Sequence, residues 1–351
     1  MKKIALVLAV AISAFAANAQ SVAKNEMKQL QAFLAQPAQE AGTNAEALGA
    51  DAKNIAGIEG VTVVDGHVTA LDWKGKKLAG TLDLSGFKAL TKVDVSRNRL
   101  TAVTLANDAA LTDVNVSRNR LTEFDMTGCS QIVRLAVNNN RLPQITIEQT
   151  PFIKYLNVSS NYLVSLNVSN SSTLETLNCQ SNHLENLAVE NCTALKNLYC
   201  GYNKLEQITL TGLVNLKNLN IDDNKISSMI VSNLPALAFF VCTDNNMQTL
   251  GVRDCQTLID LVCSYNDLTD LSVSGCPNLQ FVDCSYNDLT TLTLSNQTFL
   301  QRLICNNNQL TMLDVSFDDA LTYINCRYNQ ITDLRTQACP NLGMVACQWN
   351  Y

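Results

Sequence analysis

Cysteine is the residue type in this sequence with the widest choice of chemistry, and the chain has 13 cysteines but only 2 histidines. Thiols in such numbers form disulfides, bind metals or act as nucleophiles. The spacing of the cysteines indicates which of these uses applies. The cysteines form two sets, and within each set the members are 21 residues, or a multiple of 21, apart. The first set is Cys179, Cys200, Cys242, Cys263, Cys284, Cys305, Cys326 and Cys347. The second set is Cys129, Cys192, Cys255, Cys276 and Cys339. The elements that position the thiols must repeat with the same period.

An asparagine recurs with this period over most of the chain. Thirteen asparagines follow one another at intervals of 21 residues, without an insertion or deletion. They are Asn98, Asn119, Asn140, Asn161, Asn182, Asn203, Asn224, Asn245, Asn266, Asn287, Asn308, Asn329 and Asn350. Leucine or a close substitute precedes each asparagine by eight and by five residues and follows it by two, as Leu258, Leu261 and Leu268 do around Asn266. The chain therefore repeats one unit LxxLxLxxNxL.

The third apolar position of the unit, three residues before the asparagine, holds the first set of cysteines. Valine fills it in the first four repeats, and Ile221 is the one interruption in the cysteines that follow. The other ten residues of each unit have the related spacing LxxLxVxxC, which places the second set of cysteines. Each unit is thus built from two nested halves.

This pattern resembles the leucine-rich-repeat family, and within it the short bacterial class with a 21-residue unit, over about residues 68–351. The resemblance implies a leucine-rich-repeat solenoid of the α/β repeat class, dominated by β structure. A parallel β-sheet is expected on one face and short extended segments on the other, because the return half is too short for a helix. The asparagine side chain is expected to satisfy backbone groups at each turn, so that the column forms a hydrogen-bonded ladder.

The stacked arrangement decides the chemistry of the thiols. Equivalent residues of adjacent parallel strands lie about 4.7–4.9 Å apart with parallel side chains, whereas a disulfide needs converging Cβ atoms about 3.8 Å apart. A column of sulfur atoms also lacks the tetrahedral geometry of zinc sites, and His67 and His183 cannot complete such a site. We therefore predict buried free thiols that pack as small apolar side chains. No metal and no cofactor are expected.

Three segments divide the chain. Residues 1–19, with a basic start, an apolar run and Ala17-Asn18-Ala19, are typical of a secretory signal peptide. Residues 20–67 are expected to form an N-terminal cap of helices and a strand. It begins with an amphipathic helix whose apolar face holds Met27, Leu30, Phe33 and Leu34, and a capping box follows at residues 43–46. Residues 68–351 are expected to form the solenoid, with one degenerate repeat and thirteen regular ones.

Composition and motifs exclude several functions. Lys and Arg number 25 against 31 Asp and Glu, and removing Lys2 and Lys3 with the signal peptide leaves 23 against 31, a change in net charge from −6 to −8. An acidic chain without a run of basic residues argues against binding nucleic acid or anionic membranes. No segment after the signal peptide is apolar enough to insert into a membrane. Motifs of nucleophilic, phosphate-binding or metal-dependent enzymes are missing, and we predict a protein that is not an enzyme.

The outward strand positions and the residues just before each asparagine are expected to form the binding surface. Aromatic residues collect there in the later repeats, and exposed aromatics are enriched at recognition sites. The predicted ligand-binding residues are Phe239, Tyr265, Phe281, Tyr286, Tyr323, Tyr328 and Trp349. Mutual packing of the rings, without a ligand, is the alternative interpretation.

These observations predict an exported bacterial leucine-rich-repeat protein, periplasmic, secreted or on the cell surface. It is expected to bind a macromolecule, a host or envelope protein, through the sheet face. Two alternatives remain open at this point. One is a glycan-binding module, because aromatic, amide and acidic side chains together also suit sugars. The other is a structural surface protein that self-associates weakly through a C-terminal edge formed by Leu342, Val345 and Cys347.

Overall fold

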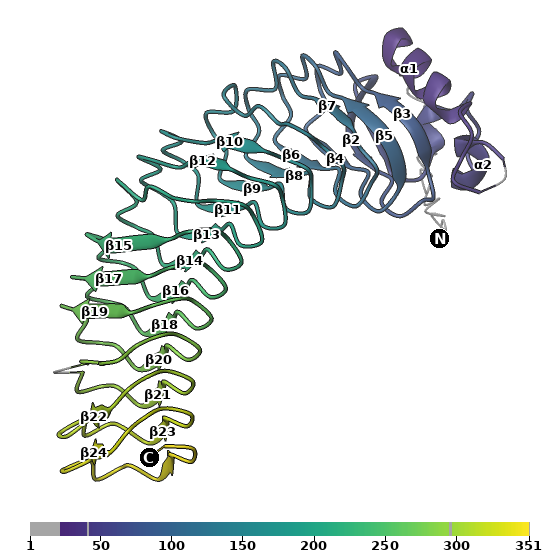
Figure 1. Cartoon of the computed structure of the whole chain (residues 1–351). Coiled ribbons are helices and arrows are strands. Elements are labelled where there is room, and N and C mark those ends of the chain that lie inside the picture. Colours follow the sequence, from purple (N-terminus) through teal and green to yellow (C-terminus); the bar gives the residue numbers. More distant parts are fainter. Residues whose placement is uncertain (1–21, 41, 295–296, 351) are drawn as a thin grey trace, which may run out of the picture.

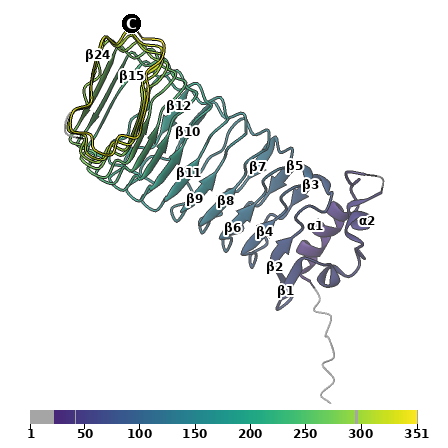
Figure 2. The same ribbon diagram turned by 90° about the horizontal axis from the view of Figure 1, so that it is seen from below.

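The computed structural model describes residues 22–40, 42–294 and 297–350. The predicted signal peptide lies outside the described residues. A stack of similar coils follows an open arc from one end of the chain to the other, with two helices at the N-terminal end (Figure 1). The C-terminal coils, seen from below in Figure 2, are flattened loops with two long sides. The solenoid predicted from the 21-residue period is confirmed.

One long side of every regular coil contributes a strand to a continuous sheet of 15 strands, which we call the front sheet. All its strands except the first pair in parallel with a step of 21 residues, as Phe239 does with Asp260. Only the first parallel step differs, because Ala70 pairs with Lys92. The strands are β1 (Val61–Val64), β2 (His67–Asp72), β4 (Lys92–Asp94), β6 (Asp113–Asn115), β8 (Arg134–Ala136), β9 (Tyr155–Asn157), β11 (Thr176–Asn178), β13 (Asn197–Tyr199), β14 (Asn218–Asn220), β16 (Phe239–Val241), β18 (Asp260–Val262), β20 (Phe281–Asp283), β21 (Arg302–Ile304), β23 (Tyr323–Asn325) and β25 (Met344–Ala346).

The return half of each coil is extended, as predicted, and its strands form four short parallel sheets, which we call the back sheets. The first holds β3 (Ala79–Asp83), β5 (Arg99–Thr104) and β7 (Glu123–Asp125). The second holds β10 (Ser165–Asn167) and β12 (Asn186–Ala188). The third holds β15 (Ser228–Ser232), β17 (Thr249–Arg253) and β19 (Asp270–Ser274), and the fourth β22 (Met312–Asp314) and β24 (Asp333–Arg335).

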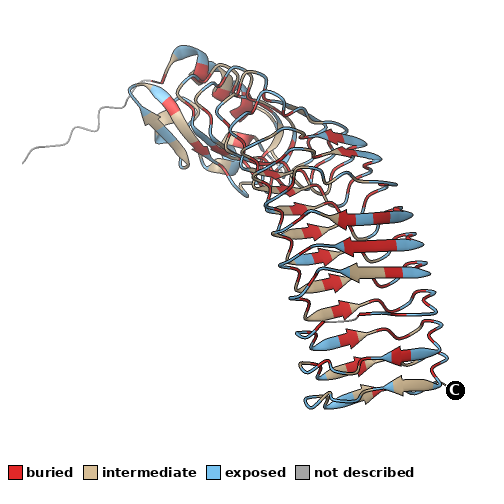
Figure 3. Ribbon diagram, turned by 90° about the vertical axis from the view of Figure 1, so that its left-hand side faces the viewer, coloured by how far each residue is buried: buried red, intermediate tan, exposed pale blue. Residues whose placement is uncertain are grey.

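The core is a set of columns that run along the stack between the two sides of each coil. Inward residues are buried while their neighbours on the strand are exposed or half-buried, an alternation visible in Figure 3. Free cysteines are part of these columns, and 11 of the 13 are buried. The prediction of buried thiols holds for those 11 and is wrong for the other two. Cys339 is half-buried and Cys347 is exposed, because both lie in the last coil, which has no described coil stacked on it.

The asparagine column forms the predicted ladder. Nδ2 of Asn266 donates to the carbonyl oxygens of Cys263 at 3.3 Å and Ser264 at 3.2 Å in its own turn, and to Cys242 in the preceding coil at 3.0 Å. Its Oδ1 accepts from the backbone N–H of Met247, also in the preceding coil, at 3.1 Å. One buried amide therefore satisfies four backbone groups and joins two coils.

The second half of the unit contains a related bond made by sulfur. Sγ of Cys129 donates to the carbonyl oxygen of Leu105, and Sγ of Cys192 to that of Val168, both at 3.0 Å. The donor lies 24 residues after the acceptor, as it does when Asn119 donates to Val95. The nested halves thus share a bonding pattern as well as a spacing.

The N-terminal segment covers the first coil on both sides. It contains α1 (Lys24–Leu34), α2 (Asn44–Leu48), a 3-10 turn η1 (Ile55–Gly57) and β1. On the front, β1 pairs antiparallel with β2 and thereby occupies the sheet edge. Within the cap, Leu30, Phe33 and Leu34 of α1 are buried as predicted, and Phe33 stacks on Trp73 of the first coil at 5.8 Å.

Two side chains close the edge of the first back sheet. Asn44 binds both backbone groups of Ala79 in β3, donating to its carbonyl oxygen at 2.9 Å and accepting from its N–H at 3.1 Å. Gln36 does the same at Thr81, with both distances 2.8 Å. These amides replace the hydrogen bonds that a preceding strand would make, so the first back sheet begins without an open edge at Ala79 and Thr81. The exact division of cap and solenoid at residue 67 stays a prediction.

Candidate binding surface

The predicted aromatic residues lie on two neighbouring columns of the solenoid. Phe239, Phe281 and Tyr323 are the first residues of β16, β20 and β23 on the front sheet. The others directly precede an asparagine in the turn that contains the asparagine column, which we call the asparagine turn. They are Tyr265, Tyr286, Tyr328 and Trp349. We refer to all seven residues as the aromatic patch.

The asparagine-turn rings are well exposed but associate in pairs. Tyr265 and Tyr286 stack with centroids 4.3 Å apart, and Tyr328 and Trp349 with centroids 5.9 Å apart. Asn307 occupies the same position in the coil between the two pairs. Exposed fractions range from 44% for Tyr286 to 70% for Trp349. The column therefore presents two short aromatic platforms rather than one continuous row.

The front-sheet rings enclose an arginine that the sequence analysis did not select. The guanidinium of Arg302 lies 5.6 Å from the ring centre of Phe281 and 5.0 Å from that of Tyr323, on the two adjacent strands. Both rings are half-buried as a result. The 21-residue period was a sufficient signal for this contact, because Arg302 stands midway between the two residues in the sequence. A cation held between two aromatic faces is a stabilising arrangement.

Phe239 is separate from the rest of the patch. It is 42% exposed, and its register partners on the neighbouring strands are Asn218 and Asp260. The structure thus brings six of the seven predicted residues into pairs or into the arginine sandwich, and leaves Phe239 without an aromatic neighbour in its column.

The four patch residues of the asparagine turn, like Tyr202 at the same position of an earlier coil, have a left-handed backbone. Their φ angles are 53° for Tyr265, 54° for Tyr286, 53° for Tyr328 and 64° for Trp349. This region disfavours side chains with a Cβ by about 1–2 kcal/mol, and glycine and asparagine occupy it most readily. Asn139 and Asn307, at the same position with φ of 56° and 55°, show that asparagine is compatible with this turn.

The opposite turn of each coil, which we call the back turn, provides an internal comparison. Its left-handed residues follow the ordinary preference for glycine, asparagine or aspartate in most coils. They are Gly86, Asn107, Gly128, Asn170, Asn191, Gly212, Asn233, Asp254 and Gly275. Phe317 and Ala338 are the exceptions, with φ of 71° and 55°. The same backbone conformation therefore carries mostly glycine, asparagine and aspartate on the back turn, whereas on the asparagine turn it also carries serine, arginine, tyrosine and tryptophan.

The surroundings of the aromatic column affect the pKa of the Tyr265 hydroxyl. Desolvation raises the pKa of the Tyr265 hydroxyl, and the adjacent Tyr286 adds to the shift. Asp222, beside the asparagine turn of an earlier coil, is half-buried, and burial raises the pKa of its carboxyl. Among the described residues, no group of three or more histidine, cysteine, aspartate and glutamate side chains is arranged to hold a metal ion.

A groove of 580 Å³ on the back side was not anticipated. It lies between residues 290–294 with Thr298 on one side and residues 311–318 on the other, where Leu292, Met312 and Phe317 line it together with several threonines. Back-sheet pairing is interrupted here, because β19 continues only as a single bridge from Ser272 to Thr293. The 21-residue repeat continues through this region, so the sequence does not indicate where two coils separate locally. The groove contains no residue of the aromatic patch.

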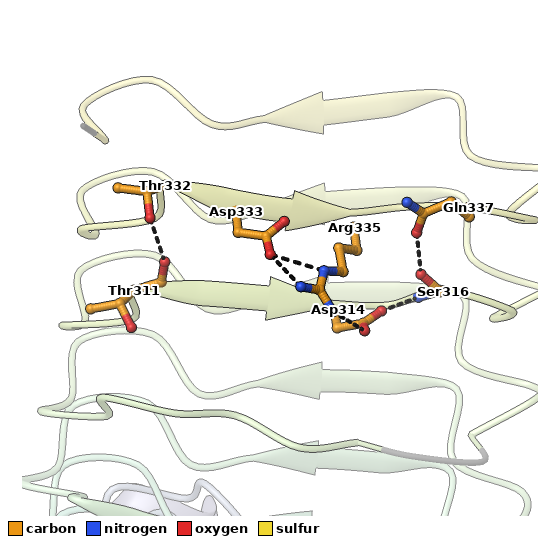
Figure 4. A network of polar contacts seen from close by, with 7 residues as sticks. All are labelled: Thr311, Asp314, Ser316, Thr332, Asp333, Arg335 and Gln337. Carbon is orange, nitrogen blue, oxygen red and sulfur yellow. Dashed lines mark hydrogen bonds and ion pairs between the residues drawn. The ribbon is translucent and has the colours of Figure 1, made fainter.

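Beside the groove, the last back sheet is linked by polar side chains (Figure 4). Arg335 of β24 binds Asp333 at 2.6 Å and reaches Asp314 of β22 at 3.7 Å. Ser316 donates to Gln337 of the next coil at 2.6 Å. These contacts join neighbouring coils and are structural in character.

At the last described coil, Leu342 and Val345 are half-buried. Self-association through this edge stays a prediction. None of the helices in the described part of the chain has the length and apolar character required to cross a bilayer.

These features define a leucine-rich-repeat solenoid, and comparison with known proteins agrees. No protein-family model and no curated protein matches the sequence. Solved structures do match, and several are bacterial leucine-rich-repeat proteins. One from Leptospira interrogans has a TM-score of 0.61 and 19% identity, over 80% of this chain and 84% of the other.

Two further structures extend the comparison. The functional domain of InlJ from Listeria monocytogenes, which includes a cysteine ladder, has a TM-score of 0.52 and 22% identity, over 85% of this chain and 71% of the other. The ectodomain of the receptor kinase GASSHO1/SCHENGEN3 from Arabidopsis thaliana, in complex with CASPARIAN STRIP INTEGRITY FACTOR 2, has a TM-score of 0.55 and 18% identity, over 93% of this chain and 53% of the other. At these identities the similarity concerns the fold.

Proposed function

We propose that this protein binds another protein, of host or envelope origin, through the aromatic patch. Leucine-rich-repeat solenoids typically serve as protein-interaction modules, and one of similar fold is known in complex with CASPARIAN STRIP INTEGRITY FACTOR 2. Tyrosine, tryptophan and arginine are the residues that most often dominate binding energy at protein interfaces. The patch, with Arg302 at its centre, has that composition.

The observation that carries the proposal is the left-handed backbone of the asparagine-turn aromatics. Tyr265, Tyr286, Tyr328 and Trp349 occupy positions where asparagine fits with less strain. Strained residues at an exposed surface persist when the side chain itself is needed. The left-handed residues of the back turn, up to Gly275, follow the local preference instead, with Phe317 and Ala338 as the later exceptions. This difference favours a role for the rings outside the fold.

The extent of the aromatic patch also supports a role in protein binding. Tyr265 and Trp349 are four coils apart, so the column extends about 19 Å at the usual spacing of strands. Together with the front-sheet rings this area suits a protein surface. Mutual stacking is the competing explanation, since a cross-strand pair contributes about 0.2–1 kcal/mol without any ligand.

Asparagine substitutions separate the two explanations. If the rings serve recognition, Tyr286→Asn with Tyr328→Asn relieves backbone strain, leaves stability unchanged or higher, and lowers affinity by about 2 kcal/mol or more for each residue that is a hot spot. If the rings only support each other, the double variant melts earlier and binding is unaffected.

The experiment compares immobilised wild-type protein with this double variant in host and envelope extracts. The control is Phe317→Asn, which replaces an exposed aromatic with the same backbone conformation at the back turn. A protein retained by wild type and by the control, but not by the double variant, supports the proposal. Equal retention by all three places the binding site elsewhere.

We further propose that the protein is exported after cleavage following Ala19. Support comes from the basic start, the apolar run and the Ala17-Asn18-Ala19 pattern of the sequence. Mass spectrometry of protein from the envelope and the medium of the producing cells tests this directly. A mature chain that begins at Gln20 is the expected result, and an intact N-terminus in the cytoplasm contradicts it.

A further inference from the structure

Five arginines gather on the asparagine turn of the early coils. Arg97 and Arg118 directly precede Asn98 and Asn119, and Arg99, Arg120 and Arg141 directly follow an asparagine of the column. All five are exposed. Residues that are 21 positions apart become neighbours in the stack, at about the 4.8 Å spacing of adjacent strands. We call these five residues the arginine stripe.

Composition alone does not reveal the charge of this part of the surface. The chain is acidic and has no run of basic residues, which argued against binding nucleic acid or anionic membranes. The fold creates a positively charged surface because it brings together Arg97 and Arg99, Arg118 and Arg120, and Arg141 from three successive coils. These three groups repeat at intervals of 21 residues, so only the period connects them.

The stripe lacks acidic partners. Among the described residues, the ion pairs of this region belong to the cap, where Lys76 binds Glu59 and Lys77 binds Glu40. None of the five arginines takes part in an ion pair with a described residue. Arg99 lies 3.1 Å from the side-chain amide of Gln39, which is neutral. The guanidinium groups therefore repel one another, and a bound anion would relieve that repulsion.

Backbone conformation indicates that the arginines are needed for their side chains. Arg97 and Arg118 have left-handed φ angles of 59° and 55°. Asn139, at the same position one coil later, adopts this conformation with less strain. The back turns of these coils hold Asn107 and Gly128 at their left-handed positions. Arginine is thus kept where the local conformation favours asparagine.

The stripe is short and ends at an aromatic platform. The column that contains Arg99, Arg120 and Arg141 continues with Tyr162 and His183, whose exposed rings stack in parallel with centroids 5.8 Å apart. Acidic residues limit the positive region on both sides. Glu40 and Glu59 belong to the cap, and Asp223 and Asp244 occupy the asparagine turns beyond the platform.

We propose that the arginine stripe and the Tyr162–His183 platform bind an anionic glycan. The planar guanidinium group binds carboxylate and sulfate through two parallel hydrogen bonds. The flat apolar face of a sugar ring stacks on an exposed aromatic ring, and the length of one sugar unit is close to the distance between coils. Carboxylate and sulfate share this chemistry, and the experiment distinguishes them.

Two other linear polyanions fit less well. An extended acidic peptide places side chains on one face at every second residue, about 6.6–6.8 Å apart, which does not match the step between coils. A nucleic acid strand would extend past the stripe and over the acidic residues at either end. The glycan surface is also separate from the aromatic patch, so failure of one proposal leaves the other intact.

Binding of the full chain to three polysaccharides tests the proposal. Heparin carries sulfate, polygalacturonate carries carboxylate, and dextran is neutral. We expect binding to heparin or polygalacturonate that weakens as salt increases, and no binding to dextran. The preferred ligand identifies the anionic group.

Substitutions locate the site. Arg118→Asn with Arg120→Gln introduces residues that the chain itself uses at these positions, in Asn139 and Gln309, so the variant retains the turn. We expect affinity to fall at least about tenfold, the loss of about 1.4 kcal/mol, without a lower melting temperature. The control, Lys204→Gln with Lys225→Gln, removes two positive charges from the same column outside the stripe. It is expected to change affinity less than about threefold, and Tyr162→Ser to weaken binding without changing its salt dependence.

Several results overturn the proposal. Equal losses from the arginine pair and the lysine pair indicate attraction by overall charge only. Tighter binding of a single-stranded oligonucleotide or of polyglutamate than of either charged polysaccharide indicates a different class of ligand. No binding to heparin or polygalacturonate at low salt rules out an anionic glycan.

Discussion

The Sγ atom of Cys129 donates a hydrogen bond of 3.0 Å to the backbone carbonyl oxygen of Leu105, which belongs to the preceding coil. Asn119 makes the corresponding bond to Val95, with the same separation of 24 residues. A thiol in one half of the unit and an amide in the other therefore both donate a hydrogen bond to a backbone carbonyl oxygen of the preceding coil. Cys129, Cys192 and Cys339 of the second half donate across coils in this way, whereas cysteine in the first half occupies a position that valine also fills.

This difference predicts unequal effects for the same substitution. Cys129→Val keeps the volume but removes the donor, and it is expected to cost about 0.5–1.5 kcal/mol, the net value of one hydrogen bond. Cys263→Val is expected to be nearly neutral, because valine occupies this column in Val95, Val116, Val137 and Val158. Urea denaturation of the two variants measures the difference. Equal destabilisation would show that the sulfur of Cys129 acts by packing alone.

Asp108 occupies the position of Cys129 one coil earlier, and it predicts a pH dependence. Its side chain is fully buried, neither carboxyl oxygen has a hydrogen-bond partner, and burial raises the pKa from 3.8 to about 7. The unfolded chain ionises Asp108 near its ordinary value. Rising pH therefore favours unfolding from about pH 4 until the folded carboxyl also ionises near pH 7. This contribution to stability is complete below pH 3.8 and is lost by about pH 7.

Asp108→Asn tests this dependence, because an amide does not ionise between pH 4 and pH 7. The gain in stability over wild type is expected to increase from pH 4 to pH 7 and to remain constant above it. Denaturation midpoints of both proteins across this range provide the measurement. Asp318, whose pKa burial raises to about 6, is present in both proteins and cancels in the difference. Parallel curves would mean that Asp108 ionises normally in the folded protein.

Asn224 lies near the middle of the stack and predicts a loss of cooperativity. Its amide donates to the carbonyl oxygens of Cys200, Ile221 and Asp222, each at 3.1 Å, and accepts from Leu205 at 2.9 Å. Asn224→Leu leaves these groups unsatisfied at about 1–3 kcal/mol each. Because stability in repeat proteins is coupled between neighbours, the coils on the two sides are expected to unfold separately. A single sharp transition with an unchanged midpoint would contradict this.

The cap offers a prediction at the first back-sheet edge. Asn44 is fully buried and binds Ala79 and Phe33 through three hydrogen bonds. Asn44→Ala is expected to cost at least about 2 kcal/mol, since the backbone groups of Ala79 lose their partners. Hydrogen exchange at Ala79 should accelerate, while exchange at Leu261, far along the stack, stays the same. Equal acceleration at both amides would indicate global unfolding instead of a frayed edge.

Periodicity explains which of these features the sequence predicted. Thirteen equally spaced asparagines leave no freedom in the register, so the solenoid, the ladder and the two strand-bearing sides could be derived. The same period also pointed to the contact of Arg302 with Phe281 and to the arginine stripe, both of which became apparent only in the fold. The groove beside Thr293 and the left-handed backbone of Tyr286 could not be derived. The first depends on a local separation of coils, and the second contradicts the preference of the residue.

The hydrogen bonds between strands connect each coil only to the preceding coil and to the following coil. When a force pulls the two ends of the chain apart, the coils are expected to unfold one after another. The first coil to give way releases 21 residues, which extend to about 70 Å when fully stretched. The molecule is therefore expected to lengthen under load in equal steps, one step for each coil that unfolds.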